Sequence, residues 1–457
     1  MATLLVGGVA FVAGLVAGDR LRQRTAELTL AWRTSRGPVP QQGYKRQGDI
    51  PGRTAAPTPE QRREIEALRS MAYVSATRQA SGAAGVTTLR RELAWPGLNL
   101  VVDTHGPEAV LLDMDGRPVH AWRHDFRGAF PDSPIRRGAE GIQYWRRVAL
   151  LGDGGVLAIF EGAGLVRLDR DSKLLWAFAE AAHHDLEVQA DGRIYVLTRR
   201  AGLRPEIHPD RPVTEDWVVV LDPQGGVLRR VSVLEAIRRS DFSRLLELTE
   251  GHGDLLHTNT VEVLDGSWSD RLPAFAAGNV LLSFPKIDTL AVLDMERESI
   301  VWSLTGMTRY QHEPTVLASG RLLVFDNWVF GGGLGARANV GRTGGGEGAG
   351  GRYSRVVEID PLRRTIEWSF GAPPGADAGR HFYTECCGAG QRLANGNTLI
   401  TETDRGRAFE ITPDGDLVWE YRTPHRVGEG DDELVARLFE VRRVERAAVA
   451  TWLPGSE

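Results

Sequence analysis

Three histidines occupy equivalent places in a repeating sequence pattern. His184 and His312 each stand eight residues before a turn glycine, Gly192 and Gly320, and His257 holds the same place ahead of another apolar strand. The chain has only 11 histidines, so their recurrence at one position indicates a shared cavity. Imidazole is neutral near pH 7 and can act as a nucleophile, as a proton donor or acceptor, or as a metal ligand.

A cation and two aromatic rings are expected beside these histidines. Arg146 stands eight residues before Gly154, the same place in its own repeat that the histidines have in theirs. A guanidinium there can bind an anionic group. Trp145 directly precedes Arg146, and Tyr310 closely precedes the last of the histidines, so both rings are candidates for holding an aromatic substrate.

The elements that position these residues repeat along the chain. Six segments share an apolar strand, a turn containing Asp, Gly or Pro, and a second apolar strand: 110–122, 165–178, 217–231, 290–304, 355–370 and 407–421. Five of the six carry a tryptophan at the matching place: Trp122, Trp176, Trp302, Trp368 and Trp419. A second kind of hairpin lies between them, for example in residues 184–199, 312–327 and 388–403.

Two hairpins form one four-stranded unit, and units that recur about every 50 residues predict an all-β, six-bladed β-propeller. A pair of β-sandwiches is the alternative, but a tryptophan at a fixed place in each unit favours blades. The innermost strand of each blade lines the central channel, so the predicted site lies at one mouth of that channel. Residues 435–444 are expected to close the ring or to pack beneath it.

The other segments complete the predicted organisation. We expect a membrane anchor at 1–20, a linker with a short helix at 21–95, the propeller at 96–445 and a tail at 446–457. Residues 3–18 carry no charge and as a helix would span about 24 Å, a little short of the ~30 Å hydrocarbon core of a bilayer. No basic residue precedes this run and no clear A-x-A site follows it, which favours an uncleaved transmembrane helix over a cleaved signal peptide. The Gly-rich loop at 331–352 lacks the spacing of a phosphate-binding loop.

Composition excludes several classes of function. Lys and Arg number 55 and Asp and Glu 60, so the formal net charge is −5 and the basic surface that nucleic acid requires is missing. No GxSxG and no suitably placed GxGxxG occurs, which argues against a serine hydrolase and a dinucleotide site. Cys386 and Cys387 are adjacent, so they form neither a disulfide framework nor a CxxC zinc pair.

Several motifs resemble the bacterial arylsulfotransferases, also called aryl-sulfate sulfotransferases. They are HHDLEVQADGRIYVL, LLHTNTVEVLDG with GNVLLSF, and QHEPTVLASGRLLVFDN followed by SRVVEIDPLRRTIEWSF. ALRSMAY, PGLNL and LLDMDGRPVHAW are similar to the lead-in of the anchored members of that superfamily. The resemblance covers roughly residues 65–445 and implies a six-bladed propeller that works outside the cytoplasm, in the periplasm, without a cofactor.

The resemblance also implies a reaction and its residues. The substrates would be an aryl sulfate and a phenol, and His312 would attack the sulfur and become transiently sulfated. His257 and His184 would stabilise the sulfuryl oxygens and help to transfer protons. The family's site arginine falls at Pro285 in this chain, with Lys286 next to it, so a lysine stands where a bidentate arginine is expected.

Two other functions remain open on the residues alone. A propeller with a membrane anchor and without the family's arginine also suits a non-catalytic assembly subunit that binds a partner in a membrane complex. Three imidazoles at one cavity could instead bind a metal such as Zn²⁺ or Cu²⁺, with the adjacent thiols nearby. Turnover that depends on His312, bound metal, or a co-purifying partner would distinguish these hypotheses.

Overall fold

The computed structural model describes residues 57–69, 82–327, 352–427 and 433–453. They belong to one compact unit, 57–457. Within the described ranges no helix is both long and apolar enough to cross a membrane, and the predicted anchor at 1–20 lies outside them.

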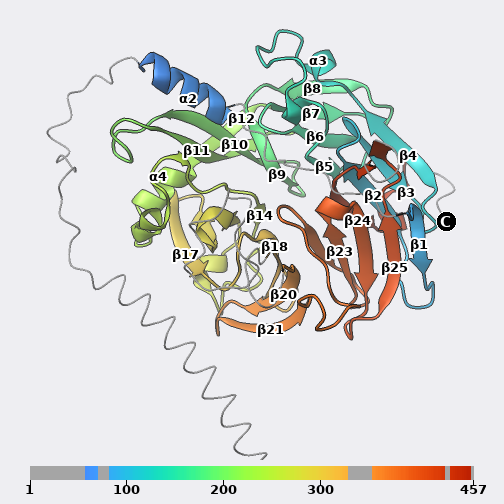
Figure 1. The fold of residues 1–457 in the computed structure, drawn as a ribbon. Coiled ribbons are helices and arrows are strands. Elements are labelled where there is room, and N and C mark those ends of the chain that lie inside the picture. The colour runs from blue at the N-terminus through green and yellow to red at the C-terminus, as the bar shows by residue number, and fades with distance from the viewer. Residues whose placement is uncertain (1–56, 70–81, 328–351, 428–432, 454–457) are drawn as a thin grey trace, which may run out of the picture. The chain divides into compact units, whose positions relative to one another are not determined.

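Six antiparallel sheets follow one another around a central axis (Figure 1), so the predicted six-bladed propeller is confirmed. From inside to outside, the first blade consists of β28 (Leu438–Val444), β2 (Leu98–Asp103), β3 (Glu108–Leu112) and β4 (Pro118–Arg123). The second consists of β5 (Arg147–Leu150), β6 (Val156–Phe160), β7 (Gly164–Leu168) and β8 (Leu174–Phe178). The third consists of β9 (Ala182–Val188), β10 (Ile194–Leu203), β11 (Pro212–Leu221) and β12 (Val227–Ser232). The fourth blade consists of β14 (Val261–Val263), β15 (Val280–Phe284), β16 (Thr289–Asp294) and β17 (Ser299–Thr305). The fifth consists of β18 (His312–Val316), β19 (Leu322–Asp326), β20 (Arg355–Asp360) and β21 (Thr365–Phe370). The sixth consists of β22 (Ala389–Arg392), β23 (Thr398–Glu402), β24 (Arg407–Ile411) and β25 (Leu417–Arg422).

Both ends of the chain contribute strands that close the ring. β28, which lies within the segment expected to close the ring or pack beneath it, is the inner strand of the first blade and pairs with β2. Strand β1 (Gly85–Leu89) was not predicted, and it adds a fifth strand to the outer edge of the last blade by pairing with β25. β13 (Gly253–Asp254) pairs with β11, and β26 (Arg426–Val427) pairs with β27 (Leu434–Val435).

The hydrophobic core lies between the blades. Six clusters of buried apolar side chains are each shared by two neighbouring sheets, and together they follow the ring around. The recurring tryptophans join blades as well, because the indole N–H of Trp176 donates to the carbonyl of Pro223 in the next blade, and Trp419 donates likewise to Met114. The repeated tryptophan is therefore a structural feature of this fold.

In the described part of the chain, three short α-helices accompany the blades: α2 (Pro59–Arg69), α3 (Phe126–Ala129) and α4 (Val233–Arg238). The helix predicted in the linker is α2, which begins with a capping box in which Thr58 and Gln61 exchange hydrogen bonds. Ile65 and Leu68 of α2 are buried against Ala201 of β10. The helix of the predicted linker thus packs against the third blade, as Figure 1 shows.

Candidate functional site

The three predicted histidines lie together at the starts of inner strands. His184 is in β9, His257 precedes β14, and His312 opens β18. The ring centroids of His184 and His257 are 4.9 Å apart. The Tyr310 ring lies 6.2 Å from that of His257 and 6.0 Å from that of His312, so four rings follow one another along the site.

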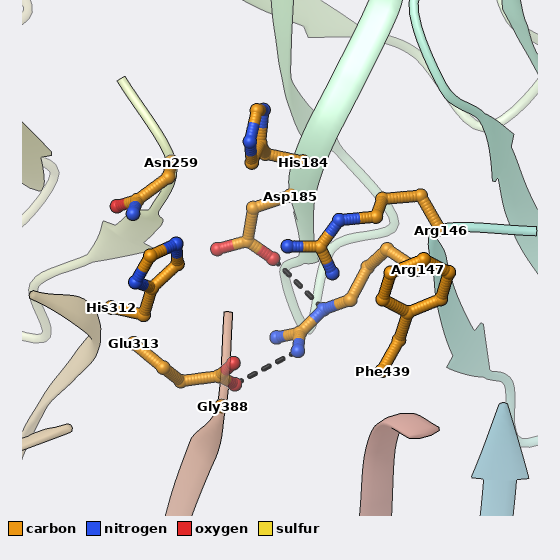
Figure 2. Close-up of a pocket in the computed structure, with 9 residues that line it drawn as sticks. All are labelled: Arg146, Arg147, His184, Asp185, Asn259, His312, Glu313, Gly388 and Phe439. Carbon is orange, nitrogen blue, oxygen red and sulfur yellow. Dashed lines mark hydrogen bonds and ion pairs between the residues drawn. The ribbon is translucent and has the colours of Figure 1, made fainter. Parts of the chain in front are cut away.

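A small cavity opens beside these rings. Its lining is mostly polar and charged, and all six blades contribute to it (Figure 2): Arg146, Arg147, His184, Asp185, Asn259, His312, Glu313, Gly388 and Phe439. The structure therefore places three of the predicted residues, His184, His312 and Arg146, directly on one cavity.

Several residues of the site have a strained backbone conformation. His184, His257 and Glu313 adopt left-handed φ angles of 54°, 59° and 46°. Bulges interrupt the pairing of β9 with β10 and of β18 with β19 next to His184 and Glu313. Left-handed backbone at a non-glycine residue costs on the order of 1–3 kcal/mol and persists where the surroundings impose it, most often at functional sites.

These bulges explain two of the cavity residues that were not predicted, Asp185 and Glu313. Arg147, Asp185 and Glu313 each directly follow a predicted residue, and in a regular strand they would point to the opposite face. The bulges and left-handed angles instead turn consecutive side chains of β9 and β18 toward the cavity. A signal was present in the sequence, since a charged residue follows the key position in three repeats as Arg-Arg, His-Asp and His-Glu.

His312 is held in one tautomer by its hydrogen bonds. The side-chain amide of Asn327 donates through Nδ2 to the carbonyls of Thr384 (3.1 Å) and Cys387 (2.9 Å), which fixes its Oδ1 as the acceptor that faces His312. His312 Nδ1 lies 2.9 Å from that oxygen and 3.0 Å from the carbonyl of Tyr310, so Nδ1 carries the proton. The lone pair is then on Nε2, where the backbone N–H of Cys387 donates at 3.2 Å.

The buried position keeps His312 neutral. Burial lowers the pKa of His312 to about 3, and the hydrogen bond to Asn327 offsets only part of that effect. Burial, together with nearby His257 and Arg146, also holds the pKa of His184 well below its ordinary value. A neutral imidazole with a defined lone pair is the form that acts as a nucleophile.

His257 forms a dyad with a buried carboxylate. Its Nδ1 lies 2.6 Å from Asp254 Oδ2, so Asp254 orients the ring. Burial would raise the pKa of Asp254, but His257 and Lys286 lower it to about 2. Lys286 donates to the main-chain carbonyl of Asp254 at 2.8 Å and lies 3.9 Å from its carboxylate. Lys286 therefore supports the dyad and is not among the residues that line the cavity.

The two arginines of the cavity differ in their ion pairing. Arg147 is paired with Asp185 (2.9 Å), Glu313 (2.8 Å) and Glu440 (2.6 Å). Arg146 is buried with its guanidinium 4.7 Å from the centre of the Phe439 ring, and none of the described carboxylates forms an ion pair with it. Arg146 thus presents a cationic fork to the cavity.

The other predicted aromatic residue lies away from the cavity. Trp145 is fully buried in the core between the first two blades, where its ring packs edge-on against Phe160. Neighbours along an extended chain point to opposite sides, so Trp145 faces the core while Arg146 faces the cavity.

A metal site built from the three predicted histidines has no support in the described residues. Their ligand atoms do not all lie within 4.8 Å of one another. Among the described residues, the groups of three that meet this distance are Glu161, His183, His184 and His105, Glu108, His425. His183 and His184 face each other with Nδ1 atoms 2.9 Å apart, so one ring donates to the other.

Comparison with known proteins identifies one family. A model of the arylsulfotransferase (ASST) family matches residues 147–424, more than half of the chain, while a search of curated proteins finds no match. Similar solved structures include a protein of unknown function from Bacteroides caccae (13% identity, 76% of this chain and 100% of that one, TM-score 0.46). A streptogramin B lyase structure is 11% identical over 80% of this chain and 98% of that one, with a TM-score of 0.40. These two likenesses carry no conclusion about function.

Proposed function

The chain belongs to the arylsulfotransferase (ASST) family, and from this premise we propose that it transfers a sulfuryl group from an aryl sulfate to a phenol through His312. The observation that carries the proposal is the state of His312, a neutral ring whose proton is fixed on Nδ1 and which lines a cavity together with Arg146.

In the first step, Nε2 of His312 attacks the sulfur, an N–S bond forms, and the bond between sulfur and the aryl oxygen breaks. The departing phenol has an ordinary pKa of about 10, so modest proton donation suffices. The guanidinium of Arg146 donates to the sulfuryl oxygens, on which the charge is spread in the transition state. Nε2 of His257, oriented by Asp254, protonates the leaving oxygen.

In the second step, a phenol takes the place of the first product. His257 accepts its proton, the phenol oxygen attacks the sulfur, and the N–S bond to His312 breaks. The two half-reactions share one site, so the kinetics are ping-pong. Tyr310, between the rings of His257 and His312, is the aromatic contact that we assign to the substrate ring. We also propose, with the predicted anchor, that the propeller works outside the cytoplasm.

The test is turnover of 4-nitrophenyl sulfate with phenol as acceptor, measured for the full chain and for His312→Ala. We expect acceptor-dependent turnover that is lost in His312→Ala and kept in His252→Ala, a histidine outside the cavity lining. Mass spectrometry of the quenched reaction without acceptor should find one added SO₃ group on the peptide that contains His312. Turnover that survives in a folded His312→Ala protein would refute the proposed nucleophile, and no turnover with any aryl sulfate would favour an assembly subunit.

A further inference from the structure

Two thiols of unassigned role lie at the edge of this site. Cys386 and Cys387 lie just before β22, separated from it by Gly388, and their Sγ atoms are 3.3 Å apart. Cys387 is buried in left-handed backbone (φ 64°), while Cys386 is partly exposed. Nη2 of Arg437 donates to Cys386 Sγ at 3.1 Å. The pair is therefore held close together beside a cation, an arrangement that favours thiolate formation.

The charges around the pair support its reactivity. The hydrogen bond from Cys386 lowers the pKa of Cys387 to about 6 against the effect of burial, with Arg146 contributing in the same direction. Arg437 is itself fixed by ion pairing with Asp404. A shared proton between two sulfurs in an electropositive pocket is typical of dithiols that undergo thiol–disulfide exchange.

The peptide that joins the two cysteines also contacts the proposed nucleophile. The N–H of Cys387, which belongs to this peptide, donates to Nε2 of His312 at 3.2 Å, and the carbonyl of Cys387 accepts from Asn327. The lone pair that must attack sulfur is thus engaged while the thiols are reduced. Adjacent Cα atoms lie about 3.8 Å apart, and a relaxed disulfide needs about 4.4–6.8 Å, so closing a bridge requires this peptide to turn.

We propose that Cys386 and Cys387 form a redox-active dithiol whose oxidation to a vicinal disulfide moves the Cys387 N–H away from His312 and frees its Nε2. Only the consequence for turnover rests on the proposed function; the disulfide and the change at His312 stand on the geometry alone.

The oxidant is a small-molecule disulfide. The thiolate of one cysteine attacks it, a mixed disulfide forms, and one thiol equivalent leaves. The second sulfur, 3.3 Å away, attacks the first, so the intramolecular S–S bond forms and a second thiol equivalent leaves. The two cysteines lose two electrons and two protons, and the external disulfide gains them. Strained disulfides are readily reduced, so the same pair reopens with a thiol reductant.

The experiment compares the full chain after treatment with oxidised glutathione and after treatment with dithiothreitol, each followed by removal of the reagent. Mass spectrometry should find the loss of two hydrogens in the peptide that contains both cysteines, and only the reduced protein should bind phenylarsine oxide, a probe for paired thiols. Acylation of His312 by diethyl pyrocarbonate, followed on its own peptide, should be about tenfold faster after oxidation, a factor that corresponds to about 1.4 kcal/mol.

Cys386→Ser and Cys387→Ser are the matched variants, since either one removes the bridge and keeps the other thiol. Both should show acylation rates at His312 that do not respond to oxidised glutathione. Failure of the wild-type chain to form the bridge, or a bridge that leaves the acylation rate of His312 unchanged, would overturn the proposal. If the disulfide and the faster acylation appear but no aryl sulfate turns over, the proposed function fails and this inference stands.

Discussion

Arg146→Ala removes a buried guanidinium from the cavity and leaves the paired Arg147 in place. The side chain stacks on Phe439, and no described carboxylate pairs with it, so the change does not strand a partner carboxylate. In the proposed reaction its loss leaves the sulfuryl oxygens without their bidentate donor. The effect should therefore fall on the rate of transfer, and the tautomer of His312 should persist because Asn327 and Tyr310 fix it.

The expected magnitude follows from the kind of hydrogen bond that is lost. A hydrogen bond to a charged group contributes about 1.5–3 kcal/mol, and removal of one preorganised donor from an anion-stabilising site costs roughly 10²–10³ in kcat. We expect kcat/KM of Arg146→Ala to fall by about that factor. Arg146→Lys should lie between the parent and Arg146→Ala, because an ammonium keeps the charge but lacks the planar fork.

The assay is steady-state turnover of 4-nitrophenyl sulfate with phenol, with thermal unfolding of each variant followed by circular dichroism. Arg321→Ala is the matched control, since Arg321 lies at the far end of the β18–β19 hairpin and pairs with Glu358 on the surface. It should turn over like the parent. A folded Arg146→Ala protein within about threefold of the parent, less than about 1 kcal/mol in transition-state free energy, would refute the assignment of Arg146.

Three further predictions follow from the site. Asn327→Ala leaves the Tyr310 carbonyl as the remaining acceptor for His312 Nδ1, so kcat should fall by about 10–100-fold with KM little changed; an unchanged kcat would contradict its positioning role. Lys286→Ala should lower kcat/KM by less than about tenfold, because Lys286 contacts Asp254 and not the cavity lining, and a larger loss in the same assay would make it a substrate contact. Burial depresses the pKa of His312 to about 3, so between about pH 6.5 and pH 3 the unfolded chain binds a proton at this residue and the folded chain does not. The free energy of unfolding should therefore drop by up to about 1.4 kcal/mol for each pH unit that the pH falls within this range. Measured by urea unfolding, the dependence of this free energy on pH should be weaker in His312→Gln than in the parent.

The fold could be predicted because each blade repeats the same local pattern. A turn glycine and a tryptophan recur at fixed distances, and the register relative to that glycine was sufficient to place His184, His312 and Arg146 on one cavity. Placing a residue in this way requires only its distance from the turn glycine of its own blade. Strand β1 was not predicted because its pairing partner, β25, lies far away in the sequence and β1 is not part of the repeated blade pattern.

The partners that define the chemistry were harder to predict. Asn327, which fixes the tautomer of His312, comes from the next strand of the same blade, while Cys387, which contacts its Nε2, comes from the neighbouring blade. The pairing of Arg147 with Asp185 and Glu313 joins three blades. These contacts depend on how neighbouring blades are rotated against one another and on local bulges, neither of which appears as spacing in the sequence.

The pairing of N-terminal with C-terminal strands of the propeller affects its folding and its resistance to proteases. Leu98 pairs opposite Val444, and Gly85 opposite Arg422, so each closing pair joins residues more than 300 positions apart. Loop closure over that length costs about 5 kcal/mol in chain entropy, and such distant contacts fold slowly, so the ring can close only after nearly the whole chain has been synthesised. Once closed, the ring opens only when a pairing between the two ends is broken. We therefore expect the lifetime of the folded protein against proteases to be set by the rate of that opening.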